Sequence, residues 1–134
     1  MLEIELFNPS QLGPGVGFSH AAAAGPLVIL GGQVACDSSG RVLAPGDIVG
    51  QFRVAIANVA TALEAAGSSP PQALKLTYFV TDVGAYRANL TAIGEAYREV
   101  FGRHYPAASL FEVSALFAPD AMVEIECLAV RRAT

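Results

Sequence analysis

The amino-acid sequence predicts an α+β domain in which two helices cover one face of a two-layer, mixed sheet. Two observations lead to this fold class. Strand-like and helix-like segments follow each other in the order β-β-β-α-β-α-β-β, and two helices can cover only one face of such a sheet. With 134 residues and no internal repeat, the chain is expected to form a single domain over residues 1–134.

The first part of the chain is predicted to form strands. Residues 2–7, LEIELF, alternate polar and apolar side chains as a strand with one solvated face does. A loop rich in glycine and proline follows. Two further strands, residues 18–24 and 27–35, are then joined by the tight turn Gly25-Pro26.

Two helices are predicted where apolar residues recur at helical spacing. The carboxylate of Asp47 can accept a free backbone N–H at the start of the first helix, and Gly67 ends it. Asp82 and Gly102 mark the start and the end of the second helix in the same way.

The remaining strands follow these helices. They are expected at residues 73–80, 109–117 and 122–130. The strand–helix–strand segments predict right-handed parallel crossovers, and the last two strands are expected to form a hairpin.

The composition restricts the class of protein. Apolar residues make up 53% of the chain and charged residues 15%, with a mean hydropathy of +0.46, which exceeds the apolar content of an ordinary soluble monomer. No apolar run reaches the roughly 18 residues that a transmembrane helix needs, so no membrane partner is expected. The apolar excess predicts burial between the subunits of a homo-oligomer.

The charge and the cysteine content restrict the partners, metal sites and cell compartment that can be expected. The net charge is −4, and the basic residues are scattered singly, which argues against nucleic-acid binding. Cys36 and Cys127 lie far apart and predict neither a disulfide framework nor a zinc site. The N-terminus lacks the pattern of a signal peptide, so a cytoplasmic protein with two reduced thiols is expected.

Strand periodicity assigns side chains to the uncovered face of the sheet. The purely apolar sets, which include Phe111 and Ile125, are expected to face the helices. The opposite sets form the open face, with Leu110, Glu112, Glu124, Glu126, Leu128 and Val130. This mixture fits a partly buried subunit contact with a polar cleft, or alternatively an acidic face in solvent. In the first case, burial would raise the carboxyl pKa values toward the general-acid range.

Six stretches of the chain also carry a family resemblance. They are LGPGVGFSHA, LVILGGQVA, FRVAIANVATALEAAGSS, KLTYFVTDVGAYRANLTAIGEAY, YPAASLFEVSAL and VEIECLAVRR, which span essentially the whole chain. Together and in this order they resemble the RidA/YjgF/UK114 family of reactive-intermediate deaminases. The resemblance implies a chorismate-mutase-like fold and a homotrimer with small-molecule clefts between subunits. It also implies hydrolysis of enamines or imines to 2-oxo acids and ammonia without a cofactor.

The resemblance assigns roles to individual residues. Glu124, in EIE, matches the glutamate that positions the attacking water, and Gly32, in GGQ, matches the glycine whose backbone lines the cleft. Phe18 stands where active members have a tyrosine. His20 is expected on the same strand face as Phe18, where it either points into the cleft or remains a partly exposed strand histidine.

The chain departs from the family at three ligand-binding positions. Ala108 stands where active members have the arginine that grips the substrate carboxylate. Loss of such a contact typically costs about 2–5 kcal/mol. Leu110 replaces a small or thiol residue, and Gly94 stands where some members have an asparagine that lines the cleft.

A replacement cation is conceivable at three other positions, Arg87, Arg103 and His104. Solvent exposure is the simpler expectation for the two arginines, and a place at the end of the second helix for the histidine. Two functions therefore stay open. One is hydrolysis of an enamine or imine with altered substrate preference, in which the backbone amides of Gly32 and Leu110 polarise the electrophile. The alternative is a trimer that binds a small-molecule ligand without turnover.

Overall fold

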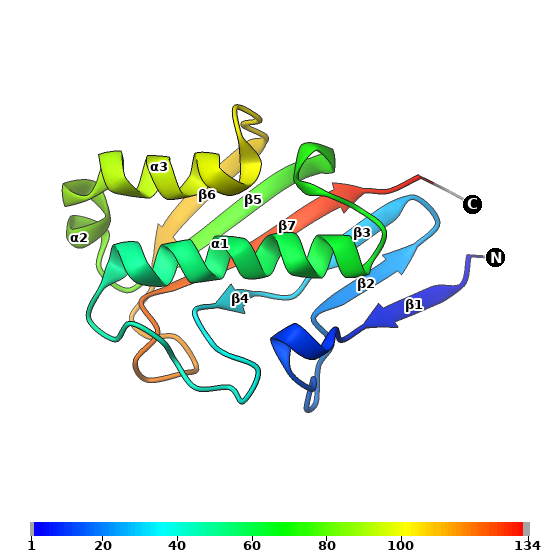
Figure 1. Cartoon of the computed structure of the whole chain (residues 1–134), viewed down its shortest axis with the longest axis horizontal. Coiled ribbons are helices and arrows are strands. Elements are labelled where there is room, and N and C mark those ends of the chain that lie inside the picture. The colour runs from blue at the N-terminus through cyan, green and yellow to red at the C-terminus, as the bar shows by residue number, and fades with distance from the viewer. Residues whose placement is uncertain (1, 133–134) are drawn as a thin grey trace.

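The computed structural model describes residues 2–132. It confirms the α+β class: α1 and α3 lie side by side across one face of a mixed sheet (Figure 1). The strands are β1 (Ile4–Phe7), β2 (Ala21–Ala24), β3 (Leu27–Leu30), β4 (Gln33–Val34), β5 (Ala73–Val80), β6 (Ala107–Glu112) and β7 (Val123–Val130). The helices are α1 (Ile48–Ala65), α2 (Val83–Ala88) and α3 (Leu90–Phe101), with 3-10 turns at Ser10–Leu12 and Pro70–Gln72.

The predicted helix ends are confirmed. Asp47 accepts a hydrogen bond from the Gly50 N–H at 2.9 Å at the start of α1, and Asp82 starts α2 through the Ala85 N–H, also at 2.9 Å. Gly67 and Gly102 have φ of +83° and +59°, a region that favours glycine and ends a helix.

The second predicted helix is divided into α2 and α3 at Asn89. The Asn89 side chain donates to the Ala85 carbonyl oxygen at 2.8 Å, and its φ and ψ of −122° and 23° depart from helical values. Asparagine side chains compete for backbone groups in this way and favour helix ends. The expected strand 27–35 is divided as well, because Gly31 and Gly32 separate β3 from the short β4.

The sheet has the strand order β1-β2-β3-β7-β5-β6, with β4 also beside β7. The predicted parallel crossover is confirmed for β5 and β6, which are parallel and connected through α2 and α3. The predicted hairpin of the last two strands is wrong. β5 lies between them, since Phe79 faces Phe111 on one side and Glu124 on the other. Residues 113–122 therefore form a loop around the end of the sheet, not a tight turn.

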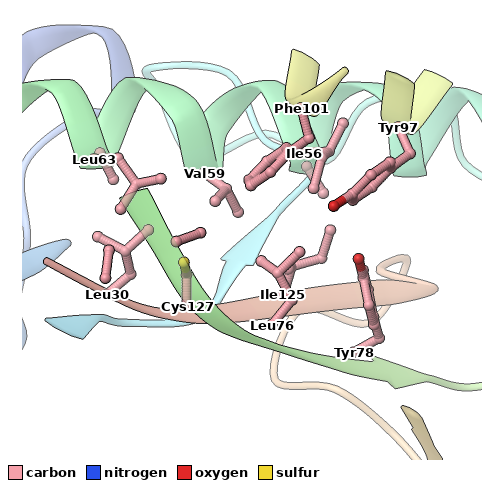
Figure 2. Close-up of a cluster of buried hydrophobic side chains, with 14 of the residues drawn as sticks. Leu30, Ile56, Val59, Leu63, Leu76, Tyr78, Tyr97, Phe101, Ile125 and Cys127 are labelled. Atoms are coloured by element: carbon pink, nitrogen blue, oxygen red, sulfur yellow. The ribbon is translucent and has the colours of Figure 1, made fainter. Parts of the chain in front are cut away.

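The face assignment is right for β7 and wrong for β6. Val123, Ile125, Cys127 and Ala129 are buried under the helices as predicted, and Figure 2 shows Ile125 and Cys127 below α1 and α3. On β6, Leu110 packs against the helix-covered core. Phe111 is 53% exposed and stacks on Phe79 on the opposite face.

Glu112 also departs from its expected place on the open face. Its carboxylate accepts a hydrogen bond from the Val83 N–H at 2.9 Å, so it lies at the first turn of α2, where a negative charge is favourable. Of the three glutamates expected on the open face, Glu124 and Glu126 remain there, on β7.

The uncovered face of the sheet is largely apolar. Large side chains exposed on it come from four strands: Ile4, Leu6, Leu27, Ile29, Phe111 and Leu128. Glu124 and Glu126 lie on the same face, and a cluster of exposed apolar side chains beside polar groups is typical of a contact surface. Within residues 2–132, none of the helices is both long enough and apolar enough to cross a membrane.

Candidate functional site

Glu124 and Gly32, which the family resemblance assigns separately to the cleft, lie in direct contact. Glu124 is on β7, and Gly32 is in the break between β3 and β4. A Cβ atom placed on Gly32 would lie 2.3 Å from Glu124 Oε2 and 2.6 Å from its Cγ. A larger residue at position 32 would displace the Glu124 side chain from this position, so the backbone at position 32 and the carboxylate at position 124 share one small space.

The environment of Glu124 makes its charged form less favourable than that of a carboxylate in water. Partial burial is the main cause that raises its pKa above the ordinary value, and the nearby negative charge of Glu126 adds to it. A carboxylate with a raised pKa accepts a proton from water more readily than an ordinary surface carboxylate does.

Phe18 and His20 precede β2, so the expected strand 18–24 begins only at Ala21. The Phe18 ring is 57% exposed and meets the His20 ring edge to face, with centroids 5.2 Å apart. The His20 carbonyl oxygen accepts a hydrogen bond from the Gly31 N–H at 2.9 Å. Phe18 and His20 are thereby placed beside the break that contains Gly32.

The His20 ring is buried and held at both nitrogens. Its Nε2 lies 3.2 Å from the Gly13 carbonyl oxygen, and its Nδ1 lies 3.2 Å from the Gln33 amide nitrogen. Since a carbonyl can only accept, Nε2–H donates and Nδ1 accepts from Gln33, which requires the neutral ring. This histidine fixes the loop that carries Phe18 and is neither free nor a partly exposed strand residue.

Ala108 and Leu110 lie on the helix-covered side of β6, opposite Leu76 and Tyr78 of β5. Ala108 lines a cavity of about 250 Å³ between the helices α2 and α3 and the strands β5 and β6. We call this cavity the tyrosine pocket, because its lining contains four tyrosines: Tyr78, Tyr86, Tyr97 and Tyr105. Phe52, Leu76, Leu90, Ile93, Gly94, Arg98 and Pro106 complete the lining.

The structure therefore brings the predicted residues together in two groups. Phe18, His20, Gly32 and Glu124 gather near the β3–β4 break, whereas Ala108 and Leu110 face the helix layer from β6. Glu124 faces the uncovered side of the sheet, opposite to Ala108. Within one chain the two groups do not face a common space.

The three basic residues considered as replacements for the missing arginine lie outside the tyrosine pocket. Arg87 lies in the last turn of α2, beside a different hollow, and Arg103 is exposed in the turn after α3. His104 Nε2 donates to the Ala73 carbonyl oxygen at 2.8 Å, so this histidine joins the end of α3 to the start of β5. None of the three is among the residues that line the tyrosine pocket.

Sequence reasoning missed Arg98, although this arginine lines the tyrosine pocket beside Gly94 and Ala108. A signal was present, because Gly94 and Arg98 are four positions apart in a predicted helix and so occupy the same face. For metals, no group of three His, Cys, Asp or Glu side chains suited to hold an ion occurs among the described residues 2–132.

Comparison with known proteins gives a consistent result. The model of the family described as Endoribonuclease L-PSP matches residues 9–131. A RutC family protein from Pyrococcus horikoshii is 33% identical over 92% of this chain and 91% of its own length. A 2-iminobutanoate/2-iminopropanoate deaminase from Capra hircus is 28% identical, over 92% and 84%.

The fold has close structural relatives. The crystal structure of Escherichia coli TdcF with bound serine superposes with a TM-score of 0.80 and 29% sequence identity. The match covers 95% of this chain and 98% of TdcF. The similarity thus extends over nearly the whole described fold, and the residues matched by the family model include Gly32, Ala108 and Glu124.

Proposed function

Because this chain belongs to the RidA/YjgF family, whose members include proteins named as imine deaminases, we propose that it hydrolyses an enamine or imine of a small metabolite. The observation that carries the proposal is the contact between the Glu124 carboxylate and the backbone of Gly32. A carboxylate with a raised pKa beside an accessible backbone is suited to hold a water molecule for attack on a C=N carbon.

The proposed reaction needs no redox step or cofactor. Glu124 accepts a proton from the attacking water while the water oxygen forms a bond to the imine carbon, and Glu124 then returns this proton to the imine nitrogen, which gives a neutral carbinolamine. The carbinolamine then collapses: the C–N bond breaks, the hydroxyl proton passes through Glu124 to the leaving nitrogen, ammonia leaves, and the C–O bond becomes the carbonyl of the product. We assign the polarisation of the electrophile to backbone N–H groups near Gly32 of one subunit and at Leu110 on the edge strand β6 of its neighbour, since an edge strand has backbone groups that pair with no further strand.

We propose that a homotrimer completes the site, with Glu124 of one subunit facing the β6 side of its neighbour. Two observations support this. The uncovered sheet face exposes large apolar residues that a single chain leaves unburied, such as Ile29 and Leu128. In addition, Ala108 and Glu124 lie on opposite sides of one sheet, so a common cleft requires a second copy.

We also propose an altered substrate preference. Ala108 offers no charge at the position where the family resemblance expects an arginine, which weakens the grip on a small carboxylate substrate. The family description also names ribonuclease activity. We do not propose it, because a chain with a net charge of −4 is poorly suited to attract RNA phosphates.

A coupled assay tests the hydrolysis. Imines of several amino acids are generated in situ by an amino-acid oxidase, and their decay is followed with and without micromolar protein. We expect faster decay with the wild-type chain and loss of this acceleration in Glu124→Gln. Glu64→Gln, which removes an exposed carboxylate on α1, serves as the matched control and should retain activity. Unchanged decay of every imine would refute the proposed hydrolysis.

The alternative is a trimer that binds a ligand in this cleft without turnover. The missing positive charge at position 108 favours it, since a substrate that is bound less firmly is also oriented less well. Ligand binding detected by calorimetry, together with no acceleration of imine decay, would select this alternative.

A further inference from the structure

The tyrosine pocket has the walls of a site for a flat, apolar group. All four tyrosines of the chain line it. Tyr97 and Tyr105 stack with ring centroids 5.5 Å apart, and Tyr78 stacks on Phe52 at 5.9 Å. Figure 2 shows the hydroxyl groups of Tyr78 and Tyr97 in the space between α3 and the sheet. Aromatic walls with a few polar groups are typical of small-molecule sites.

Two small residues keep this pocket open. Gly94 contributes no side chain from α3, and Ala108 contributes only a methyl group from β6. A Cβ atom on Gly94 would lie 3.1 Å from Nη1 of Arg98 and 3.8 Å from its Cζ. The Arg98 guanidinium is therefore folded back over Gly94, one helical turn earlier, in the direction that helical side chains normally take.

The charge of Arg98 is available to a ligand. Two ion pairs occur among residues 2–132, Arg53 with Glu99 and Arg131 with Glu5, and neither includes Arg98. Glu99, the neighbour of Arg98 along α3, is already paired with Arg53. Arg98 is exposed at the rim of the pocket, and an unpaired guanidinium in this position can form two parallel hydrogen bonds with a carboxylate.

We propose that Arg98 binds the carboxylate of a 2-imino or 2-oxo acid whose aromatic or bulky apolar side chain occupies the tyrosine pocket. Arg98 thereby supplies, from α3, the positive charge that position 108 lacks, while Ala108 and Gly94 leave space for the larger side chain. The substrate class rests on the proposed function, but the anion site does not, since it requires only the pocket and its rim.

Isothermal titration calorimetry with three stable probes tests the anion site. The probes are 3-phenylpropanoate, the neutral 3-phenyl-1-propanol and propanoate, which lacks the ring. We expect 3-phenylpropanoate to bind best, and Arg98→Gln to weaken its binding about tenfold or more, as loss of a charge-assisted hydrogen bond does. The same substitution should leave the affinity for the alcohol unchanged.

Two further variants make the result specific. Arg87→Gln removes another exposed arginine, which lies beside a different hollow, and should change neither affinity. Gly94→Leu fills the pocket and should weaken both phenyl probes. The anion site is overturned if 3-phenylpropanoate does not bind, if Arg98→Gln binds it as wild type does, or if Gly94→Leu leaves both phenyl probes unaffected.

Turnover separates this inference from the proposed function. If the imine of phenylalanine is hydrolysed with a higher kcat/KM than the imine of alanine, and Arg98→Gln reduces this preference, the substrate class is supported. Equal kcat/KM values for the two imines would overturn the substrate class and leave the proposed hydrolysis standing. Probe binding through Arg98 without turnover of any imine would reject the proposed function and retain the anion site.

Discussion

Substitution of Gly32 by alanine should move the Glu124 carboxylate out of its place. The added Cβ would lie 2.3 Å from Oε2, whereas ordinary van der Waals contact begins near 3.4 Å, so the carboxylate must shift by roughly 1 Å. A shift of that size in a catalytic group can cost on the order of 100-fold in rate. Gly32 has no left-handed φ, so the effect comes from the contact and not from backbone strain.

A double-mutant cycle measures this contact directly. In the wild-type background, Gly32→Ala should destabilise the fold by about 1 kcal/mol, the low end of the cost of overpacking, because the displaced Glu124 side chain is flexible and half-buried. In a Glu124→Ala background the clashing atoms are absent, and Gly32→Ala should then change the free energy of unfolding by less than about 0.5 kcal/mol. Urea unfolding gives the free energies, and imine decay gives kcat/KM. Equal destabilisation in both backgrounds, or full activity of Gly32→Ala, would refute the reasoning.

Three further predictions concern pH dependence, stability and assembly. Glu126→Gln removes the neighbouring charge that helps to raise the pKa of Glu124. Since the carboxylate form is the proton acceptor, the acidic limb of the pH profile of kcat/KM should move to lower pH. An acidic limb at the wild-type pH would count against Glu124 as the proton acceptor. His20→Ala removes one of the two acceptors of the Gln33 amide and the donor of the Gly13 carbonyl and should lower the free energy of unfolding by about 1–3 kcal/mol in urea titrations, whereas wild-type stability would show that water replaces the ring without loss. Ile29→Lys places a charge on the uncovered sheet face and should convert the proposed trimer to monomers, so that light scattering gives the trimer mass for the wild-type chain and the monomer mass for the variant; an equal mass for both would place the contact elsewhere or refute the trimer.

Local signals in the sequence identified most of the helix boundaries. Asp47 and Asp82 were recognisable as caps, and Gly67 and Gly102 as ends, because these features depend on residues within one or two turns. The division at Asn89 was missed, because the apolar spacing on both sides of it is compatible with one continuous helix.

The errors in the sheet arose from long-range pairing. Which strand lies beside β7 is decided by packing of whole elements, so the insertion of β5 between β6 and β7 left no local trace. The face of β6 was misassigned because both alternating sets contain large apolar residues, Leu110 in one and Phe111 in the other. An apolar outer face removes the contrast on which period-two arguments depend.

For the candidate site, too, the sequence pointed to some residues and missed others. The family resemblance assigned Gly32 and Glu124 to the cleft, but their contact became visible only in the structure. Arg98 was not predicted, because nothing in the sequence relates it directly to Ala108. The alternatives that the sequence suggested were basic residues close to Ala108 along the chain, Arg103 and His104, and Arg87 on the predicted helix. The relevant relation was the four-residue spacing to Gly94 on α3, which matters only once the pocket below it is known.

The placement of the tyrosines gives the protein a localised optical signal. The chain contains four tyrosines and no tryptophan, and every tyrosine lines the one pocket under α3. Near-ultraviolet circular dichroism and intrinsic fluorescence therefore report almost entirely on this region, whereas far-ultraviolet circular dichroism reports on all helices and strands. Coincident melting curves would mean that the α3 layer unfolds with the whole sheet. An earlier loss of the tyrosine signal would reveal a local opening of α3, which spectroscopy could follow without any added label.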